Sequence, residues 1–137
     1  MRVFLDANIL FSAARSNGAI NQLLRLLAQS GHACCVDSYV IEEGRRNLAI
    51  KAPERISALE HLLRRMEQAT VMHGVDDELE ASLPLAAKDR PVLAAAIQQQ
   101  CDALMTGDRM HFGALYGHTI HGVAIHSPRS LAEALLA

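Results

Sequence analysis

Aromatic residues and cysteines are scarce in this sequence. Among 137 residues there are no tryptophans, two tyrosines and three phenylalanines. Extensive stacking of nucleic-acid bases on aromatic side chains is therefore not expected. Cys34, Cys35 and Cys101 contain no Cys-x-x-Cys motif, and an odd count forms no disulfide framework. We expect buried free thiols in the reducing environment of a cytoplasmic protein.

An excess of charge of one sign and long hydrophobic runs are also absent. Thirteen Lys and Arg against fifteen Asp and Glu give a formal net charge of −2. This balance excludes a polybasic arm and, taken alone, argues against nucleic-acid binding. The apolar run at residues 92–97 is far shorter than the roughly 20 residues that cross a bilayer. Asp6 interrupts any signal-peptide segment, so we expect neither a membrane span nor a secretory signal.

The overall composition is typical of a folded domain. Apolar residues make up 50% and charged residues 20% of the chain, which is ordinary for a globular protein and too apolar for disorder. Domains most often have about 100–150 residues. The sequence shows no internal repeat, low-complexity segment or linker. We therefore expect residues 1–137 to form a single domain.

Short apolar runs alternate with helical patterns along the chain. Strands are predicted at residues 2–5, 33–36, 70–72, 103–106 and 123–126. Helices are predicted at about residues 18–30, 38–50, 53–66, 91–100 and 127–136. This alternation indicates βαβ units with helices on both faces of the sheet. We predict an α/β fold, a three-layer α/β/α sandwich with a central, mostly parallel, twisted sheet of four to five strands.

Acidic residues stand at the ends of several predicted elements. Asp6 follows the first strand directly, and Asp108 follows the fourth. Glu42 or Glu43 lies in the first turns of the helix after the second strand, and Asp89 lies at the start of the helix before the fourth. The carboxyl ends of parallel strands and the starts of the returning helices share one edge of a sheet. Four carboxylates can therefore converge on one pocket.

Such a cluster is unfavourable without a cation. Two unit charges about 4 Å apart interact by roughly 4 kcal/mol at an effective dielectric constant near 20. Hard divalent ions such as Mg²⁺ and Mn²⁺ prefer oxygen ligands and offset this repulsion. They also supply Lewis acidity and orient in-line phosphoryl displacement. The pattern thus predicts a metal site before it predicts a substrate.

Each acidic residue also has a local interpretation to be weighed against metal binding. Asp89, just before a proline, is typical of a helix cap. Glu42 and Glu43 are placed to compensate a helix dipole. Asp108, after a glycine, is placed as a turn residue. For Asp6, which closes an apolar strand, no turn role is evident, and this favours the ligand interpretation.

Five segments follow one another in the order and spacing of a known family. They are Val3–Leu10, Glu43–Leu48 (the loosest match), Lys88–Ala96, Cys101–Asp108 with Arg109–Phe112 after it, and Val123–Pro128. In these segments the chain resembles the PIN-domain family of small metal-dependent ribonucleases. The resemblance covers essentially the whole chain.

This resemblance implies a set of site residues. The catalytic and metal-binding acids would be Asp6, Glu43, Asp89 and Asp108. Asn8 and Thr106 would lie next to these acids and support them without binding the metal themselves. Glu43 is preferred to Glu42 because the family's acid is followed by a short polar stretch and then a leucine, which here is Leu48. The metal would be Mg²⁺ or Mn²⁺.

The implied activity is hydrolysis of an RNA phosphodiester by metal-activated water, leaving a 5′-phosphate and a 3′-hydroxyl. Arg45, Arg46 and Arg109 are candidates for contacts with RNA phosphates, although Arg45 and Arg46 also fit a solvated helix face. The implied partners are RNA, an antitoxin protein of a bacterial toxin–antitoxin pair, and a second copy in a homodimer. The alternative function is a non-catalytic PIN-fold module that binds RNA or protein. Loss of one or more of the acids would mark that case, and all four positions are filled.

Two further groups of polar residues are expected to play no part in the chemistry. The seven histidines match no zinc motif and are expected to be scattered over surface and partly buried positions. Asp102 stands at the start of a strand and is expected to be structural.

Overall fold

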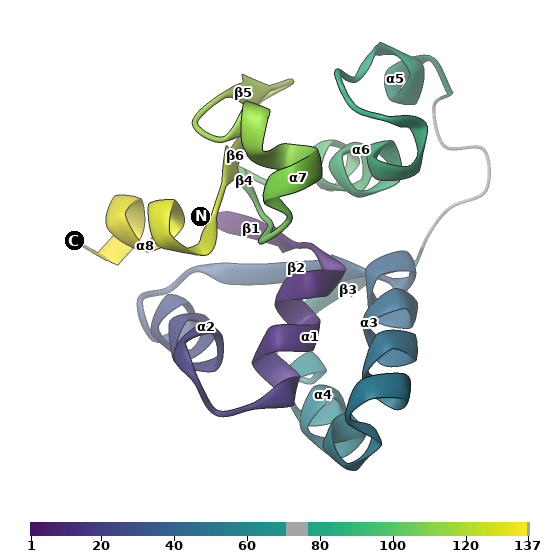
Figure 1. Cartoon of the computed structure of the whole chain (residues 1–137). Helices are drawn as coiled ribbons and strands as arrows, with labels where there is room; N and C mark the ends of the chain where they lie inside the picture. The colour runs from purple at the N-terminus through teal and green to yellow at the C-terminus, as the bar shows by residue number, and fades with distance from the viewer. Residues whose placement is uncertain (71–76, 137) are drawn as a thin grey trace.

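A six-stranded sheet forms the middle layer of the fold (Figure 1). In the computed structural model, which describes residues 1–70 and 77–136, the strand order is β3-β2-β1-β4-β6-β5. The strands are β1 (Arg2–Leu5), β2 (Ala33–Asp37), β3 (Glu67–Ala69), β4 (Ala103–Met105), β5 (Thr119–Ile120) and β6 (Val123–His126). The β5–β6 pair is antiparallel and all other neighbours are parallel.

Helices cover both faces of this sheet. On one face lie α1 (Ala7–Arg15), α2 (Ala19–Gln29), α3 (Ser38–Lys51) and α4 (Ile56–Leu63). On the other lie α5 (Asp77–Ser82), α6 (Arg90–Gln98) and α7 (Arg109–Phe112), while α8 (Pro128–Leu136) follows β6. Single 3₁₀ turns occupy Pro53–Arg55, Ala87–Asp89 and Gly113–Leu115. The predicted three-layer α/β/α architecture is confirmed.

The two central strands are buried and end side by side. Val3–Leu5 in β1 and Ala103–Met105 in β4 are fully buried, as expected for parallel strands with both faces covered. The backbone N–H of Asp6 donates to the carbonyl of Met105 over 3.1 Å, which fixes the two strand ends against each other. The polar residues that follow each strand therefore emerge at the same edge of the sheet.

Helices α1, α5 and α7 and strand β5 are not among the predicted elements. Helix α1 begins directly after β1, with no loop, and its buried Ile9, Leu10 and Ala13 share one face at helical spacing. Helix α7 is a single turn, too short for a periodic pattern. The antiparallel β5 likewise has only two residues, and with it the sheet has six strands rather than four to five.

The third strand lies earlier than predicted. It was expected at residues 70–72, but β3 spans Glu67–Ala69; Thr70 lies outside it, and residues 71 and 72 lie outside the described part of the chain. This edge strand is polar and largely exposed, so it carries no apolar signal.

The remaining expectations from composition concern thiols and membranes. Cys34, Cys35 and Cys101 are free and buried, as predicted. None of the helices in residues 1–70 and 77–136 has the length and apolar character that a membrane span requires.

Asp37 fixes the start of α3 at the same edge of the sheet. The cap of this helix is Asp37, whose Oδ1 accepts a hydrogen bond from the Val40 N–H over 3.0 Å. Burial raises the pKa of this carboxyl, whereas the backbone hydrogen bonds lower it. Asp37 thus sets where α3 begins, and with it the position of Glu43.

Replacing Asp37 by alanine is expected to lower the free energy of unfolding by about 1–2 kcal/mol, because the amides at the start of α3 lose their acceptor. Asp37→Asn keeps an acceptor and is expected to cost less than about 0.5 kcal/mol. Urea denaturation at neutral pH measures both changes. An alanine variant as stable as the asparagine variant would contradict the capping role.

Candidate active site

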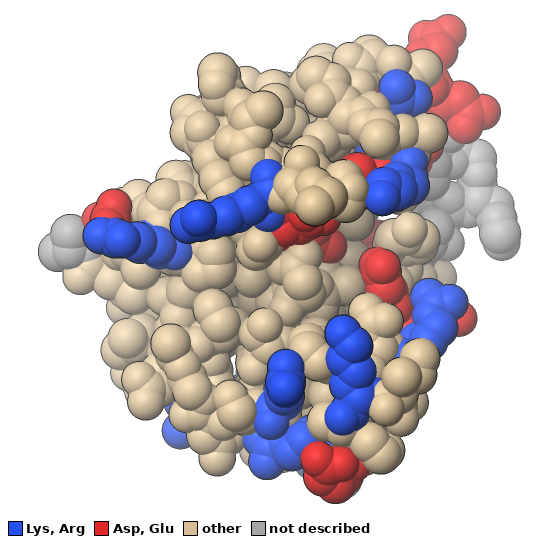
Figure 2. All heavy atoms as spheres, viewed as in Figure 1, with Lys and Arg blue, Asp and Glu red and all other residues tan. Residues whose placement is uncertain are grey.

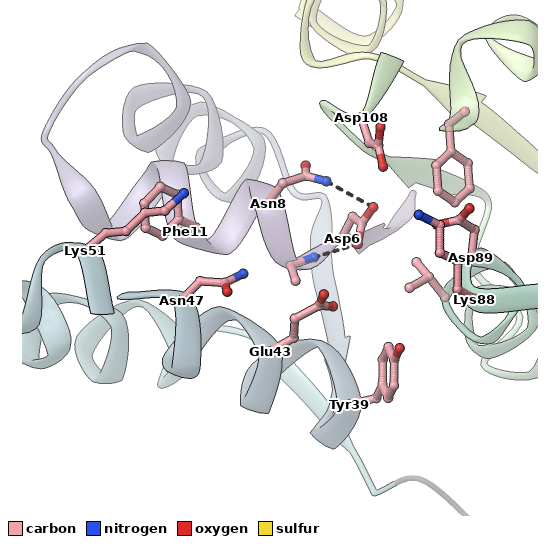
Figure 3. Close-up of a pocket in the computed structure, with 13 residues that line it drawn as sticks. Asp6, Asn8, Phe11, Tyr39, Glu43, Asn47, Lys51, Lys88, Asp89 and Asp108 are labelled. Carbon is pink, nitrogen blue, oxygen red and sulfur yellow. Dashed lines mark hydrogen bonds between the residues drawn. The ribbon is translucent and has the colours of Figure 1, made fainter. Parts of the chain in front are cut away.

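One pocket at the carboxyl edge of the sheet contains all four acids singled out from the sequence (Figure 3). It has a volume of about 240 Å³. Its walls are formed by Asp6, Ala7, Asn8, Phe11, Tyr39, Glu43, Asn47, Lys51, Lys88, Asp89, Val92, Asp108 and Phe112. The acids come from the ends of β1 and β4, from α3, and from the turn before α6, so four separate parts of the chain supply one each.

Asp6 is the most constrained of the four. Its side chain is 6% exposed, and Oδ1 accepts from the Ala7 N–H over 2.7 Å, so that Asp6 is also the cap of α1. Oδ2 accepts from the Thr106 hydroxyl over 2.8 Å and from the Asn8 amide over 3.1 Å. Burial, and to a smaller extent the Asp108 charge, raises the pKa of Asp6, while these three hydrogen bonds lower it. The local role that the sequence did not reveal is helix capping.

Asn8 and Thr106 tie the two strand ends together. The Asn8 Oδ1 accepts from the Gly107 N–H over 2.8 Å, and the Thr106 hydroxyl oxygen accepts from the Asp108 N–H over 3.2 Å. A Cβ at Gly107 would lie 3.3 Å from Asn8 Oδ1, a tight contact that favours glycine there. The two residues thus occupy the supporting positions expected from the sequence, behind Asp6 and Asp108.

Asp108 is held by hydrogen bonds to α7, the helix that follows it. Its Oδ1 accepts from the His111 N–H over 3.1 Å, which caps α7, and its Oδ2 lies 2.6 Å from the His111 Nδ1. Partial burial works to raise the pKa of Asp108, but the hydrogen bonds and charge of His111, together with Lys88, lower it below its ordinary value. Asp108 is therefore a cap and lies in the pocket at the same time.

Asp89 does not cap α6, although its position before Pro91 is typical of a cap. Its side chain makes no capping hydrogen bond to that helix. Instead, Asp89, Asp108 and His111 each place one oxygen or ring nitrogen within 4.8 Å of the other two. Among the described residues no other group of three such side chains meets this spacing. Asp6 and Glu43 line the same pocket outside this group.

The structure distinguishes between Glu42 and Glu43. Glu43 is half-buried and lines the pocket, whereas Glu42 is exposed and lies outside it. Burial and the charges of Asp6 and Asp89 raise the pKa of Glu43, and Arg46 opposes them. The carboxylates are thus close enough to repel one another, which is the situation that a bound cation relieves.

The arginines named from the sequence lie outside the pocket. Arg45 pairs with Glu60 through two hydrogen bonds of 2.9 and 2.7 Å. Arg46 and Arg109 are exposed on α3 and α7. Contact of these arginines with RNA stays a prediction. Asp102, expected to be structural, accepts a hydrogen bond from the Arg2 N–H over 2.7 Å.

Several residues in the pocket or next to it were missed in the sequence. His111 was treated as one of many scattered histidines, although its spacing of three from Asp108 could have indicated contact across one helical turn. Lys88 stands next to Asp89 within a recognised segment and brings a positive charge to the acidic end of the pocket. No sequence pattern indicated that Phe11 and Lys51 lie in the pocket, because their proximity depends on how α1 packs against α3.

The donor set fits a hard divalent cation. Carboxylates from four elements face one cavity, where burial and, to a smaller extent, neighbouring carboxylates raise the pKa of Asp6 and of Glu43. Oxygen ligands of this kind suit Mg²⁺ and Mn²⁺ better than softer metals. His111 adds a nitrogen next to Asp89 and Asp108, which Mn²⁺ also accepts.

The protein is thus an α/β sandwich with a mostly parallel sheet. A pocket lined by carboxylates lies at the carboxyl edge of that sheet. The family model of the PIN domain matches residues 2–110. The chain belongs to the PIN-domain family. A search of curated proteins gave no significant match.

Solved structures share this fold at low sequence identity. The chain is similar to one in VapBC2 from Rickettsia felis bound to a DNA fragment from their promoter, with 21% identity, a TM-score of 0.67, and coverage of 93% of this chain and 98% of that one. VapBC-1 from nontypeable Haemophilus influenzae gives 12% identity, a TM-score of 0.63 and coverages of 94% and 99%. VapC20 from Mycobacterium tuberculosis, described as a Sarcin-Ricin loop cleaving toxin, gives 11% identity and a TM-score of 0.61, with coverage of 82% of this chain and 93% of that one.

The hydroxyl of Thr106 is expected to stabilise the fold by holding the buried Asp6 carboxylate. Thr106→Val removes this donor at constant shape and is expected to lower the free energy of unfolding by about 1.5–3 kcal/mol, the range for hydrogen bonds to charged groups. Thr106→Ser loses only a methyl group, at about 1 kcal/mol. Urea denaturation in EDTA compares the two. Equal stability of the valine and serine variants would rule out this contribution.

Proposed function

We propose that this chain is a metal-dependent endoribonuclease that hydrolyses RNA phosphodiester bonds. The observation that carries the proposal is the meeting of Asp6, Glu43, Asp89 and Asp108 in one pocket of a PIN-domain protein. A PIN-fold module that only binds RNA or protein has no need for four mutually repelling carboxylates. The intact set therefore favours catalysis over binding alone.

Mg²⁺ or Mn²⁺ would be held by these acids. When bound, such an ion supplies a Lewis acid that activates water and offsets the charge that develops on the phosphate. Asp6 presents a carboxylate whose orientation is fixed by Thr106, Asn8 and its own helix. Asp89 and Asp108 supply oxygens on the opposite wall, within reach of each other.

The remaining pocket residues position the substrate. Lys88 lies at the acidic end and is placed to attract a phosphate group of the RNA strand. Glu43 makes no hydrogen bond among the described residues, so its carboxylate is free to turn toward a cation or a water molecule. Among the described residues, neither a serine nor a cysteine lines the pocket, which is consistent with direct attack by water.

The biological setting is proposed from the structural neighbours. VapBC2 and VapBC-1 are similar in fold, and VapC20 is described as a Sarcin-Ricin loop cleaving toxin. We propose that residues 1–137 form a single PIN-like domain that acts as the cytoplasmic toxin of a toxin–antitoxin pair. An antitoxin protein and a second copy of the chain in a homodimer would be its partners. The buried free thiols fit a reducing compartment.

Cleavage of RNA tests the proposed activity. Purified protein is incubated with a mixture of single-stranded and structured RNAs in Mn²⁺ or Mg²⁺, and fragments are separated on a gel. We expect cleavage that EDTA abolishes and that Asp6→Asn and Asp89→Asn reduce by about 100-fold or more, since each removes a charge from the ion site. The fragments should carry a 5′-phosphate.

The adjacent glutamates provide a matched control for this assay. Glu43→Gln is expected to abolish cleavage to the same extent as the aspartate variants, whereas Glu42→Gln, one residue away and exposed, should cleave as the wild type does. Cleavage that persists in EDTA would contradict the metal mechanism. If no RNA in the mixture is cut with metal present, the nuclease proposal fails and the binding module remains.

Metal binding is expected to stabilise the chain independently of any activity. At a Mn²⁺ concentration 100 times the Kd, the free energy of unfolding rises by about 2.7 kcal/mol, because only the folded state assembles the pocket. Differential scanning calorimetry should show a higher Tm that EDTA reverses. Glu43→Gln should reduce this shift and Glu42→Gln should leave it unchanged; no shift in the wild type would argue against a metal site.

A further inference from the structure

The end of the pocket farthest from the acids is built around one aromatic ring. Phe11 on α1 and Lys51 on α3 line this end, and the Lys51 Nζ lies 5.4 Å from the centre of the Phe11 ring (Figure 3). The guanidinium carbon of Arg15 lies 5.7 Å from the same ring centre. Two cations from two helices thus gather around a single half-buried phenylalanine.

The charges of these two cations are not compensated by nearby acids. Neither Arg15 nor Lys51 forms an ion pair within the part of the chain that the structure describes. By contrast, Arg45 on the same α3 is paired with Glu60, and Arg129 on α8 is paired with Glu133. Lys51, which lines the pocket, therefore remains available to an anion that enters it, and Arg15 lies beside the same phenylalanine ring.

The ring restricts cations that would otherwise be mobile. A cation–π contact at an exposed site is worth about 0.5–1 kcal/mol and leaves the positive charge intact. Arg15 and Lys51 are the last residues of α1 and α3, and a cation is favoured at a helix C-terminus. The helix ends account for the presence of two cations, but not for their meeting over one ring that lines the pocket.

The cations lie beyond the reach of a phosphate held at the acids. Ala7, Phe11 and Arg15 follow one another at a spacing of four along the same face of α1, so Arg15 is about two turns, or roughly 11 Å, from the acidic end. Lys51 is eight residues, or roughly 12 Å along α3, from Glu43. In Figure 2, basic side chains lie over the ends of α1 and α3 with an acidic group beside them, and the acidic side chains near the sheet edge have further basic side chains next to them (Figure 2).

We infer that Phe11, Lys51 and Arg15 form a phosphate-binding subsite for a single-stranded RNA segment, distinct from the phosphate under attack. This inference rests on the proposed nuclease function for the acidic end alone. A strand with one phosphate at the acids would place a neighbouring phosphate of the same chain against Lys51 and Arg15. Phe11 acts as a positioning residue that orients both cations, and Asn47 completes the wall between the two ends. The binding is to the backbone and does not read sequence.

The salt dependence of RNA binding tests this subsite. A fluorescein-labelled oligouridylate dodecamer is titrated with protein in Ca²⁺ by fluorescence anisotropy, with a gel to verify that the RNA stays intact. Each lost phosphate contact on a single strand should lower the slope of log K against log salt by about 0.7, which corresponds to about five-fold weaker binding at about 0.1 M salt. Lys51→Gln and Arg15→Gln should each show this change, and Lys51→Arg should not.

Two further variants separate positioning from charge and from folding. Phe11→Leu keeps both cations and should weaken binding about two- to five-fold without changing the slope, because only the cation–π orientation is lost. Arg25→Gln removes an equal charge from α2, outside this pocket, and should bind RNA as the wild type does. If the cluster only stabilises the fold, Lys51→Gln would lower the Tm and leave the slope unchanged.

The outcomes distinguish this subsite from the proposed catalytic activity. An unchanged slope in both Lys51→Gln and Arg15→Gln overturns the subsite, as does an equal loss in Arg25→Gln or a wild type that does not bind the dodecamer. Cleavage is measured separately in Mn²⁺. Protein that binds with the expected slopes but cuts no RNA supports the subsite and contradicts the nuclease, and the reverse result contradicts the subsite alone.

Discussion

The buried carboxylate of Asp6 accepts hydrogen bonds from the Ala7 amide, the Asn8 side chain and the Thr106 hydroxyl. A charge in this position is costly unless its oxygens are satisfied, so the end of β1, the start of α1 and the end of β4 must meet at one point. The same contacts aim the carboxylate at the pocket. Asn8 extends the network to Gly107, where the chain turns toward Asp108. Folding of the sheet edge and preparation of the site are therefore one process.

The near-neutral net charge of the chain and the proposed binding of RNA are reconciled by the way charge is distributed within the pocket. A net charge of −2 argues against nucleic-acid binding when the charges are averaged over the surface. In the structure four acids face one end of a cavity, while Lys51 lines its other end and Arg15 lies beside the same phenylalanine ring. With a divalent ion at the acids both ends would be locally positive. Such a pocket suits a short stretch of RNA and does not require a basic surface.

Much of the fold and of the acidic set was predictable from the sequence, for identifiable reasons. Buried central strands are continuous apolar runs, and parallel strands bring the residues that follow them to one edge, so Asp6 and Asp108 were expected together. Capping could not be separated from site formation, because helix N-termini lie at that same edge: Asp6 and Asp108 are caps as well, while Asp89 is not. The contact between Phe11 and Lys51 depends on the packing of two helices and leaves no local pattern.

Asp6 and Asp108 each cap a helix and also line the pocket. These two roles decide how an inactive form of this chain can be prepared. Replacement of Asp6 or Asp108 by alanine removes a helix cap together with a pocket carboxylate, so a loss of function there is mixed with a local change of backbone. Glu43 projects from the second turn of α3, is half-buried, and makes no hydrogen bond among the described residues. A neutral residue of the same size at this position leaves the surrounding scaffold intact. For the proposed nuclease, Glu43 is thus the suitable position for a substitution that stops cleavage, whether for crystallisation with an uncut RNA or for production in a host that the proposed toxin would harm.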